Sequence, residues 1–355
     1  MSSSSGSQDI QRQVDSIQRE FSRLEDQAEF TDVHSTIGQI EERLAEYPLE
    51  LKALEQRGYL HTRQIHELLD MLKGQWRKTA PQLRLSLRKE ENKITSAVKG
   101  TSRLVSQAKS GRQSSIASAK KSLDDLERKL RAADQTLRSQ YGNTDSELYG
   151  VKTSLTRAEW MMDQLDESSE IKLRTGEGPL LAVESEWHRD KDEGPKGLLF
   201  LTDQRLLFEQ KEKIVTKKRF GIFTAESKMV QKLWIDVNVN DIESVKDSEE
   251  GGFLGMGKDD ILELTFSGKA AVSRARFHLK GQDSADWRTE IKRSRSGEIA
   301  NERNEAAGAA YASQALSFPS QCPNCLAPLP EPHRGATYLT CEFCGTSVGP
   351  KESDQ

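Results

Sequence analysis

The segment Gly197-Leu-Leu-Phe-Leu-Thr-Asp-Gln-Arg-Leu-Leu-Phe208 contains two short apolar runs, which the polar tetrapeptide Thr202-Asp203-Gln204-Arg205 separates. Apolar runs of this length that are bounded by turn residues are typical of strands buried in a sheet. The segment therefore predicts a β-hairpin over residues 197–208.

The residues around this hairpin continue the strand pattern. After Lys172 the hydrophobic period changes from about 3.6 residues to two, which indicates a change from helix to strand. A short helix capped by Asp283 or Ser284 ends the region and carries Trp287 and Ile291 four positions apart. Many short strands followed by one helix predict a strongly bent sheet or barrel that the helix plugs. The further strands are predicted over residues 180–187, 218–224, 229–235, 242–245, 261–266 and 275–280.

The hairpin resembles the signature of GRAM/pleckstrin-homology-like domains, which is a glycine, an apolar strand, Thr-Asp-x-Arg and a second apolar strand. The resemblance implies a PH/GRAM-like domain over residues 171–295 that docks on a membrane surface or a protein partner, although fold alone does not fix function. In lipid-binding relatives, basic residues near the early strand connections hold phosphorylated headgroups. Alternatively, the basic residues belong to an ordinary solvated loop, because Glu209 and Glu212 reduce the positive charge there. The corresponding residues here are Lys211, Lys213, Lys217, Lys218 and Arg219.

A glycine-rich loop over residues 252–258 offers a second candidate contact. Its apolar residues Phe253, Leu254 and Met256 could enter a membrane interface or a partner groove. The alternative is a plain connection between two strands. A phosphate-binding loop is excluded, because Asp259 stands where that motif needs Ser or Thr and a strand follows where it needs a helix.

Residues 8–170 are predicted to form an α-helical coiled coil or elongated bundle. Apolar residues recur at alternating intervals of four and three, which is a heptad seam that predicts self-association. The first seven residues are predicted to be a disordered tail rather than a signal peptide. The seam begins with Ile10, Val14, Ile17, Phe21 and Leu24.

Prolines and glycines predict where these helices end. Pro48 indicates a break or the first turn of the next helix, and Pro81 indicates another boundary. A long helix is predicted over residues 82–140, with Gly142 in its C-terminal cap. A fourth helix follows, starting near Thr144.

Charge is distributed in blocks along these helices. Residues 73–121 carry thirteen basic and two acidic residues, whereas residues 20–55 carry ten acidic and three basic ones. The acidic helices could neutralise the basic one across the seam. Alternatively, the basic helix binds lipid headgroups or nucleic acid. The segment contains one aromatic residue, Trp76, which weakens a role in base stacking.

The C-terminal residues contain the most specific motif. Cys322 and Cys325 form one C-x₂-C pair, and Cys341 and Cys344 form a second pair fifteen residues later. This spacing predicts a zinc ribbon over residues 320–349, joined by a linker over residues 296–319. Four thiolates close the shell of one structural Zn²⁺ and leave no position for a catalytic water.

These features predict a multidomain α+β protein and favour a non-enzymatic adaptor over an enzyme. Hydrophobic residues make up 35% of the chain and charged residues 30%, which suits solvated helices and small domains. No catalytic histidine or nucleophile motif is present. Cysteines confined to one metal motif predict a cytoplasmic protein, with peripheral membrane contact as an option. The expected partners are a second copy and a protein or anionic membrane, with no small-molecule substrate. The alternative is a nucleic-acid-associated protein that uses residues 73–121 and the ribbon.

Overall fold

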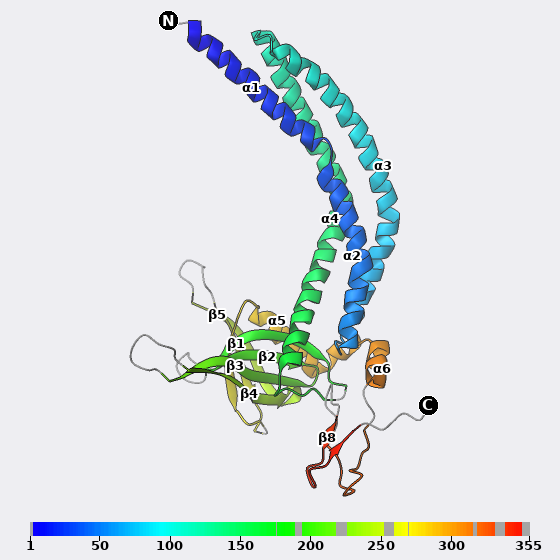
Figure 1. The fold of residues 1–355 in the computed structure, drawn as a ribbon, viewed down its shortest axis with the longest axis vertical. Coiled ribbons are helices and arrows are strands. Elements are labelled where there is room, and N and C mark those ends of the chain that lie inside the picture. The colour runs from blue at the N-terminus through cyan, green and yellow to red at the C-terminus, as the bar shows by residue number, and fades with distance from the viewer. Residues whose placement is uncertain are drawn as a thin grey trace. The chain divides into compact units, whose positions relative to one another are not determined.

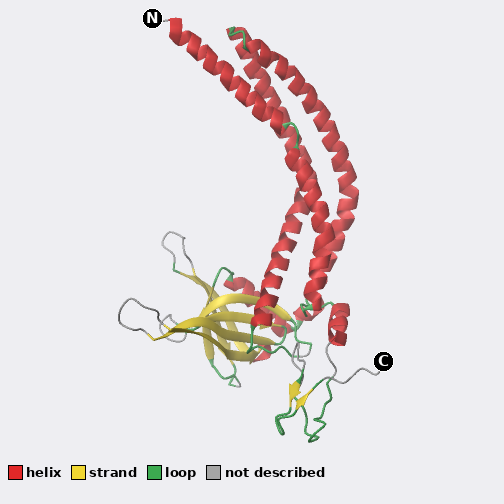
Figure 2. Cartoon of the chain, viewed as in Figure 1, coloured by secondary structure: helices red, strands yellow, loops and turns green. Residues whose placement is uncertain are grey.

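A computed structural model describes residues 3–174, 176–188, 194–217, 226–251, 259–268, 270–314, 318–330 and 338–349. The chain divides into two compact units (Figures 1 and 2). The first unit is helical and contains residues 1–48 and 67–153. The second contains residues 49–66 and 154–355, which include the β-sheet. No helix in the described ranges is long and apolar enough to cross a membrane.

The predicted heptad seam forms the core of the helical unit. Val14, Ile17 and Leu24 are buried, and they pack within a single chain rather than against a second copy. Helices from distant parts of the sequence meet here, since Arg23 pairs with Glu127. The four long helices are α1 (Ser3–Gln27), α2 (Thr31–Gln56), α3 (Arg63–Ala108) and α4 (Gln113–Glu167).

The helix ends differ from the prediction. Helices α2 and α3 run through Pro48 and Pro81, and α4 runs through Gly142. An interior glycine costs only about 1 kcal/mol and a proline about 3 kcal/mol, which the burial of a few side chains can offset. The breaks fall instead at Phe30, Gly58 and Gly111, whose φ angles are 49°, 90° and 72°. All three residues have positive φ, which a continuous right-handed helix cannot contain.

Helix α1 also begins earlier than expected. It starts at Ser3, inside the stretch predicted to be a disordered tail over residues 1–7. Adding residues to the end of an existing helix requires no new nucleus, so even polar serines can extend it.

The second unit contains one seven-stranded antiparallel sheet in the order β4-β3-β2-β1-β7-β6-β5. The predicted hairpin is confirmed: Leu201 lies opposite Leu206 and Leu198 opposite Glu209. A Cβ at Gly197 would lie 1.9 Å from the carbonyl oxygen of Glu209, so this close approach requires glycine. The strands are β1 (Pro179–Trp187), β2 (Lys196–Thr202), β3 (Arg205–Lys217), β4 (Glu226–Asn238), β5 (Ile242–Glu250), β6 (Asp259–Phe266) and β7 (Arg274–Leu279).

The sheet is open rather than closed into the expected barrel. Among the described residues, no ladder joins β4 to β5 at the two ends of the strand order. Helix α5 (Ser284–Ser296) packs against β5 and β6 as predicted, and Asp283 caps it by accepting a hydrogen bond from the Ala285 N–H. The strand predicted over residues 218–224 lies outside the described residues.

Aromatic side chains fill the inside of this sheet. Trp187 contacts Phe208 edge-on at 5.9 Å between ring centroids, and Phe208 lies 5.2 Å from Phe277. Trp287 and Ile291 of α5 are fully buried against the same cluster. The interior is therefore a packed core, so any ligand of this unit would contact its surface.

The segment predicted as a linker over residues 296–319 contains regular structure. A 3₁₀ helix, η2 (Glu298–Glu302), is followed by α6 (Glu305–Gln314). Two short strands, β8 (Leu339–Thr340) and β9 (Ser347–Val348), then pair in the cysteine-rich tail.

Candidate metal centre

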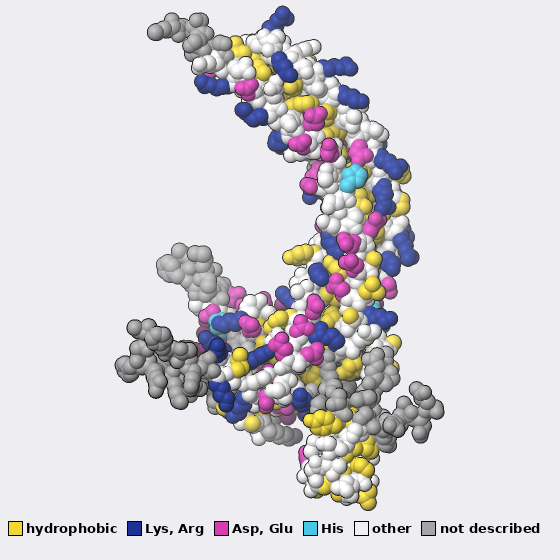
Figure 3. Space-filling view, viewed as in Figure 1, with side chains coloured by type: hydrophobic (Ala, Val, Ile, Leu, Met, Phe, Trp, Pro, Cys, Tyr) yellow, Lys and Arg dark blue, Asp and Glu magenta, His cyan; other side chains and the backbone are white. Residues whose placement is uncertain are grey.

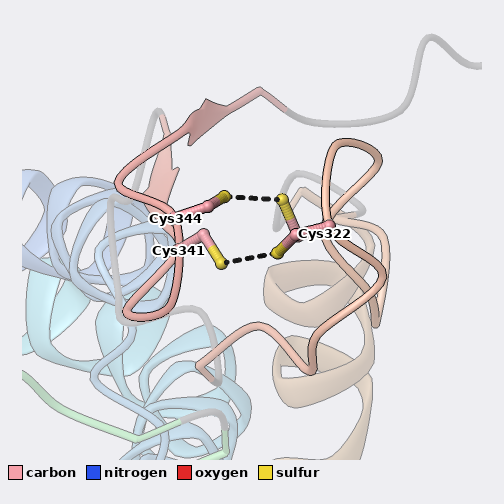
Figure 4. Close-up of side chains that lie close together, drawn as sticks. Cys322, Cys341 and Cys344 are labelled. Atoms are coloured by element: carbon pink, nitrogen blue, oxygen red, sulfur yellow. Dashed lines mark hydrogen bonds between the residues drawn. The ribbon is translucent and has the colours of Figure 1, made fainter.

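The two cysteine pairs lie on matching backbone turns (Figure 4). In the first turn, the Leu326 N–H donates to the Cys322 carbonyl at 2.8 Å. In the second, the Gly345 N–H donates to the Cys341 carbonyl at 2.9 Å. The residue after each second cysteine has left-handed backbone, with φ of 60° at Leu326 and 70° at Gly345. Each turn aims two thiols at one point.

The four sulfur atoms form a compact cluster of the right size for a metal ion. All of them lie within 4.8 Å of one another. Cys322 Sγ lies 3.6 Å from Cys344 Sγ, and Cys325 Sγ lies 3.5 Å from Cys341 Sγ. A tetrahedral ion with metal–sulfur bonds of 2.3 Å needs sulfur atoms about 3.8 Å apart. The four cysteines can therefore hold a metal ion.

The electrostatics of the cluster also favour a cation. Hydrogen bonds from the Thr346 side chain and backbone, with help from the Cys325 thiol, lower the pKa of Cys344 to about 6. A backbone hydrogen bond at Ala327 lowers the pKa of Cys325, but the thiols of Cys344 and Cys341 outweigh it and raise that pKa to about 12. Cys344 thus loses its proton easily, and the loss of a proton from Cys325 becomes harder. A divalent cation would allow all four to lose their protons.

Small polar side chains support the second turn. Asn324 Nδ2 lies 3.1 Å from Thr346 Oγ1 and 3.7 Å from Cys344 Sγ. Thr346 Oγ1 lies 3.2 Å from Cys344 Sγ and can donate its hydroxyl proton to a thiolate there. Buried Cys322, Cys341 and Val348 form the core of this tail. A core this small has little stability of its own, so a bound ion would supply much of it.

The predicted basic cluster is only partly described, and the described part is not a free anion site. Lys211 on β3 donates to Glu167 Oε2 at 2.8 Å and to Gln164 Oε1 at 3.2 Å, so a carboxylate already neutralises it. Lys213 is exposed on the same strand. The other predicted contacts lie outside the residues whose side chains are described: Lys217, Lys218, Arg219, Phe253, Leu254 and Met256.

Sequence reasoning missed a buried polar network next to the hairpin turn. Arg205 donates to both oxygens of Glu177, at 3.0 Å and 2.8 Å, and to Asp236. Burial alone would lower the pKa of Arg205, but its bonds to Glu177 and Asp236 raise it above its usual value. His61 and Arg303 approach the adjacent Asp203 Oδ2 at 3.2 Å and 3.1 Å. The Thr-Asp-x-Arg motif was visible in the sequence, whereas its partners come from distant segments.

Comparisons with known proteins add little to this geometry. Neither a family model nor a curated protein sequence matches the chain. The DH/PH domains of p115-RhoGEF match at 10% identity over 74% of this chain and 98% of that chain, with a TM-score of 0.22. Autoinhibited Vav1 matches at 14% identity over 96% of this chain and 63% of that chain, with a TM-score of 0.24. Likeness at these TM-scores does not show a shared fold, so nothing known of those proteins carries over to this one.

Proposed function

We propose that this protein is a non-enzymatic adaptor whose zinc ribbon presents an apolar surface to a protein partner. The PH/GRAM-like unit would supply a second docking surface. The observation that carries the proposal is that apolar side chains are exposed on the ribbon, in a segment whose sequence contains few charged residues. The cytoplasm suits this proposal, because its reducing conditions keep the thiols available to metal.

The metal is proposed to be zinc in a structural role. Tetrahedral sets of four thiolates bind zinc or iron, and zinc is the usual ion for paired C-x₂-C turns. Because four protein ligands complete the shell, the ion would not bind a substrate. Its role would be to hold the two turns in place.

Leu326 supports a binding role because its position is unfavourable for the fold. The matching residue in the second turn is Gly345, and left-handed backbone costs a residue with a side chain roughly 1–2 kcal/mol. The Leu326 side chain is 71% exposed, so it gains little by burial within the chain. Contact with a partner would account for a leucine at this position.

The neighbouring surface has the chemistry of a protein contact rather than a nucleic-acid contact. Phe343, at the tip of the second turn, is 70% exposed, and Tyr338 is exposed as well. Within residues 318–349 the sequence has a single Arg and no Lys, in a chain that is 30% charged. Affinity for nucleic acid depends mainly on cations that contact phosphates. The ribbon therefore does not support the alternative function.

Self-association remains a prediction, but the heptad seam no longer supports it. The heptad seam that suggested it is buried within one chain, as the burial of Ile17 and Leu24 shows. A homo-oligomer would therefore have to use other surfaces. Sedimentation of the full chain over a range of concentrations measures its oligomeric state directly.

The adaptor proposal is tested with two variants of the full chain. Leu326→Gly with Phe343→Ser removes the exposed apolar groups and leaves all four cysteines in place. Glu342→Gln changes the neighbouring exposed residue and serves as the control. We expect both variants to bind one zinc ion per chain. In quantitative cross-linking in cells, the double variant should lose partner proteins that the control retains. Recovery of the same proteins with both variants would refute the role of the ribbon.

A further inference from the structure

Helix α3 carries a predominantly cationic face. Nine Lys and Arg residues lie between Lys73 and Arg103, all of them exposed, and the only acidic residues in this interval are Glu90 and Glu91. Both acids are engaged, Glu90 with Lys93 and Glu91 with His34. Figure 3 shows Lys and Arg side chains along the edge of the helical unit where α3 lies.

The spacing of these cations places them on one side of the helix. Six of them recur at intervals of four, seven or eleven residues, and each of these intervals returns to nearly the same face of an α-helix. From Lys73 to Arg103 the face extends about 45 Å at a rise of 1.5 Å per residue. The six residues are Lys73, Arg77, Arg84, Arg88, Lys99 and Arg103.

The acidic helices do not neutralise this face. Among the residues that the structure describes, Arg84 pairs with Glu41 on α2 and Lys93 pairs with Glu90 on α3 itself. No ion pair to a described residue is present for the other seven cations: Lys73, Arg77, Lys78, Arg88, Lys89, Lys99 and Arg103.

Helix α4 shows that this distribution is not a general property of the unit. Its Arg128, Arg131 and Arg138 each pair with an acidic residue three or four positions earlier on the same helix. Such pairs neutralise a solvated helix surface locally. Of the nine α3 cations, only Lys73 and Lys93 have an acidic residue three or four positions earlier, Asp70 and Glu90, so most of the charge is available to an external anion.

We propose that this face of α3 binds the surface of a membrane that contains anionic lipids. A bilayer offers a continuous sheet of headgroups, so cations along one helix face can reach them together. The phosphates of a DNA duplex wind around its axis, so a row of cations along one helix face would meet them only in places. Leu85, exposed among the cations, would reach the acyl boundary.

Other features of α3 also favour a bilayer over nucleic acid. Single-stranded nucleic acid is held largely by stacking on aromatic side chains. The only aromatic residue between Lys73 and Lys121 is Trp76, and it is buried in the helical core. This proposal uses different residues from the adaptor proposal, and neither depends on the other.

The test compares two triple variants of the full chain that lose the same charge. Arg77→Gln, Arg88→Gln and Arg103→Gln neutralise the α3 face, whereas Arg128→Gln, Arg131→Gln and Arg138→Gln neutralise three exposed arginines of α4. Glutamine is a good helix former, and circular dichroism will show whether both variants keep their helix content. Binding is measured by co-sedimentation with phosphatidylcholine vesicles that contain about 30% phosphatidylserine, with pure phosphatidylcholine vesicles and with duplex DNA.

Each basic residue near an anionic surface contributes roughly fivefold to affinity, so the α3 variant should bind the phosphatidylserine vesicles about a hundredfold more weakly. The α4 variant should lose far less, and pure phosphatidylcholine should bind neither variant nor the unmodified chain. Four results would overturn the proposal: no binding to phosphatidylserine vesicles, equal binding to neutral vesicles, equal losses in the two variants, or tighter binding to DNA.

Discussion

The burial of the ion pair between Arg205 and Glu177 predicts a large loss of stability when the pair is broken. The Glu177 side chain is fully buried and Arg205 is only 6% exposed. Arg205 Nη2 also donates to the backbone oxygen of Lys172 at 2.8 Å. The Arg205→Met variant keeps an unbranched side chain of similar reach but leaves the Glu177 carboxylate in the interior without its cation.

Removing one partner of a buried pair costs about 3–5 kcal/mol, because the remaining charge has lost its water and its counter-ion. The free energy of unfolding of this unit should therefore fall by that amount. Urea denaturation of the full chain, followed by tryptophan fluorescence, measures it; Trp187 and Trp287 in the core of the sheet are two of the five tryptophans that contribute. Adding Glu177→Leu to Arg205→Met should recover much of the loss, since the orphaned charge is then gone.

The matched control is Arg288→Met, which breaks a half-exposed pair with Asp247. Pairs of that kind contribute about 0–1 kcal/mol, because water screens both charges. A loss at Arg205 no larger than the loss at Arg288 would refute the argument. So would a double variant that is as unstable as Arg205→Met alone.

Three further predictions concern the metal centre and the buried phenol of Tyr59. Cys341→Ser should abolish binding of one zinc ion per chain and make the tail sensitive to protease; unchanged metal content by mass spectrometry would contradict the site. Leu326→Gly should stabilise the ribbon by about 1 kcal/mol through release of backbone strain, measured as slower zinc loss to a chelator, and faster loss would contradict it. Burial raises the pKa of Tyr59 to about 12, so the folded state holds the phenol proton more tightly than the unfolded state does. The free energy of unfolding should therefore fall by about 1.4 kcal/mol per pH unit as the pH rises from 10 to 12. Tyr59→Phe should flatten that slope, and an unchanged slope would exclude this origin.

The features predicted correctly from sequence are those that neighbouring residues determine. The hairpin depends on two apolar runs and the Thr202–Arg205 turn between them, and Gly197 is required by the strand directly opposite. The metal cluster depends on two turns that each orient their own pair of cysteines. In both cases the interaction that forms the feature lies within a few residues of the motif.

The features that sequence missed depend on contacts between distant segments. Pro81 and Gly142 disfavour helix locally, yet packing of the long helices keeps both inside a continuous one. Asp203 was read as a turn residue, although its carboxylate also holds His61 and Arg303 from opposite ends of the chain. Single-sequence patterns contain no information on which distant side chain will be the partner.

The two proposed contact surfaces of this protein differ in their charge. Helix α3 has nine cations and two acids between Lys73 and Arg103, whereas residues 318–349 of the ribbon contain a single Arg and no Lys. Salt screens the first kind of contact, since the Debye length is about 8 Å at physiological ionic strength. The second kind would depend on burial of Leu326 and Phe343, which salt does not weaken. Because the two contacts rely on different forces and different residues, an adaptor could hold an anionic membrane and a protein partner at the same time.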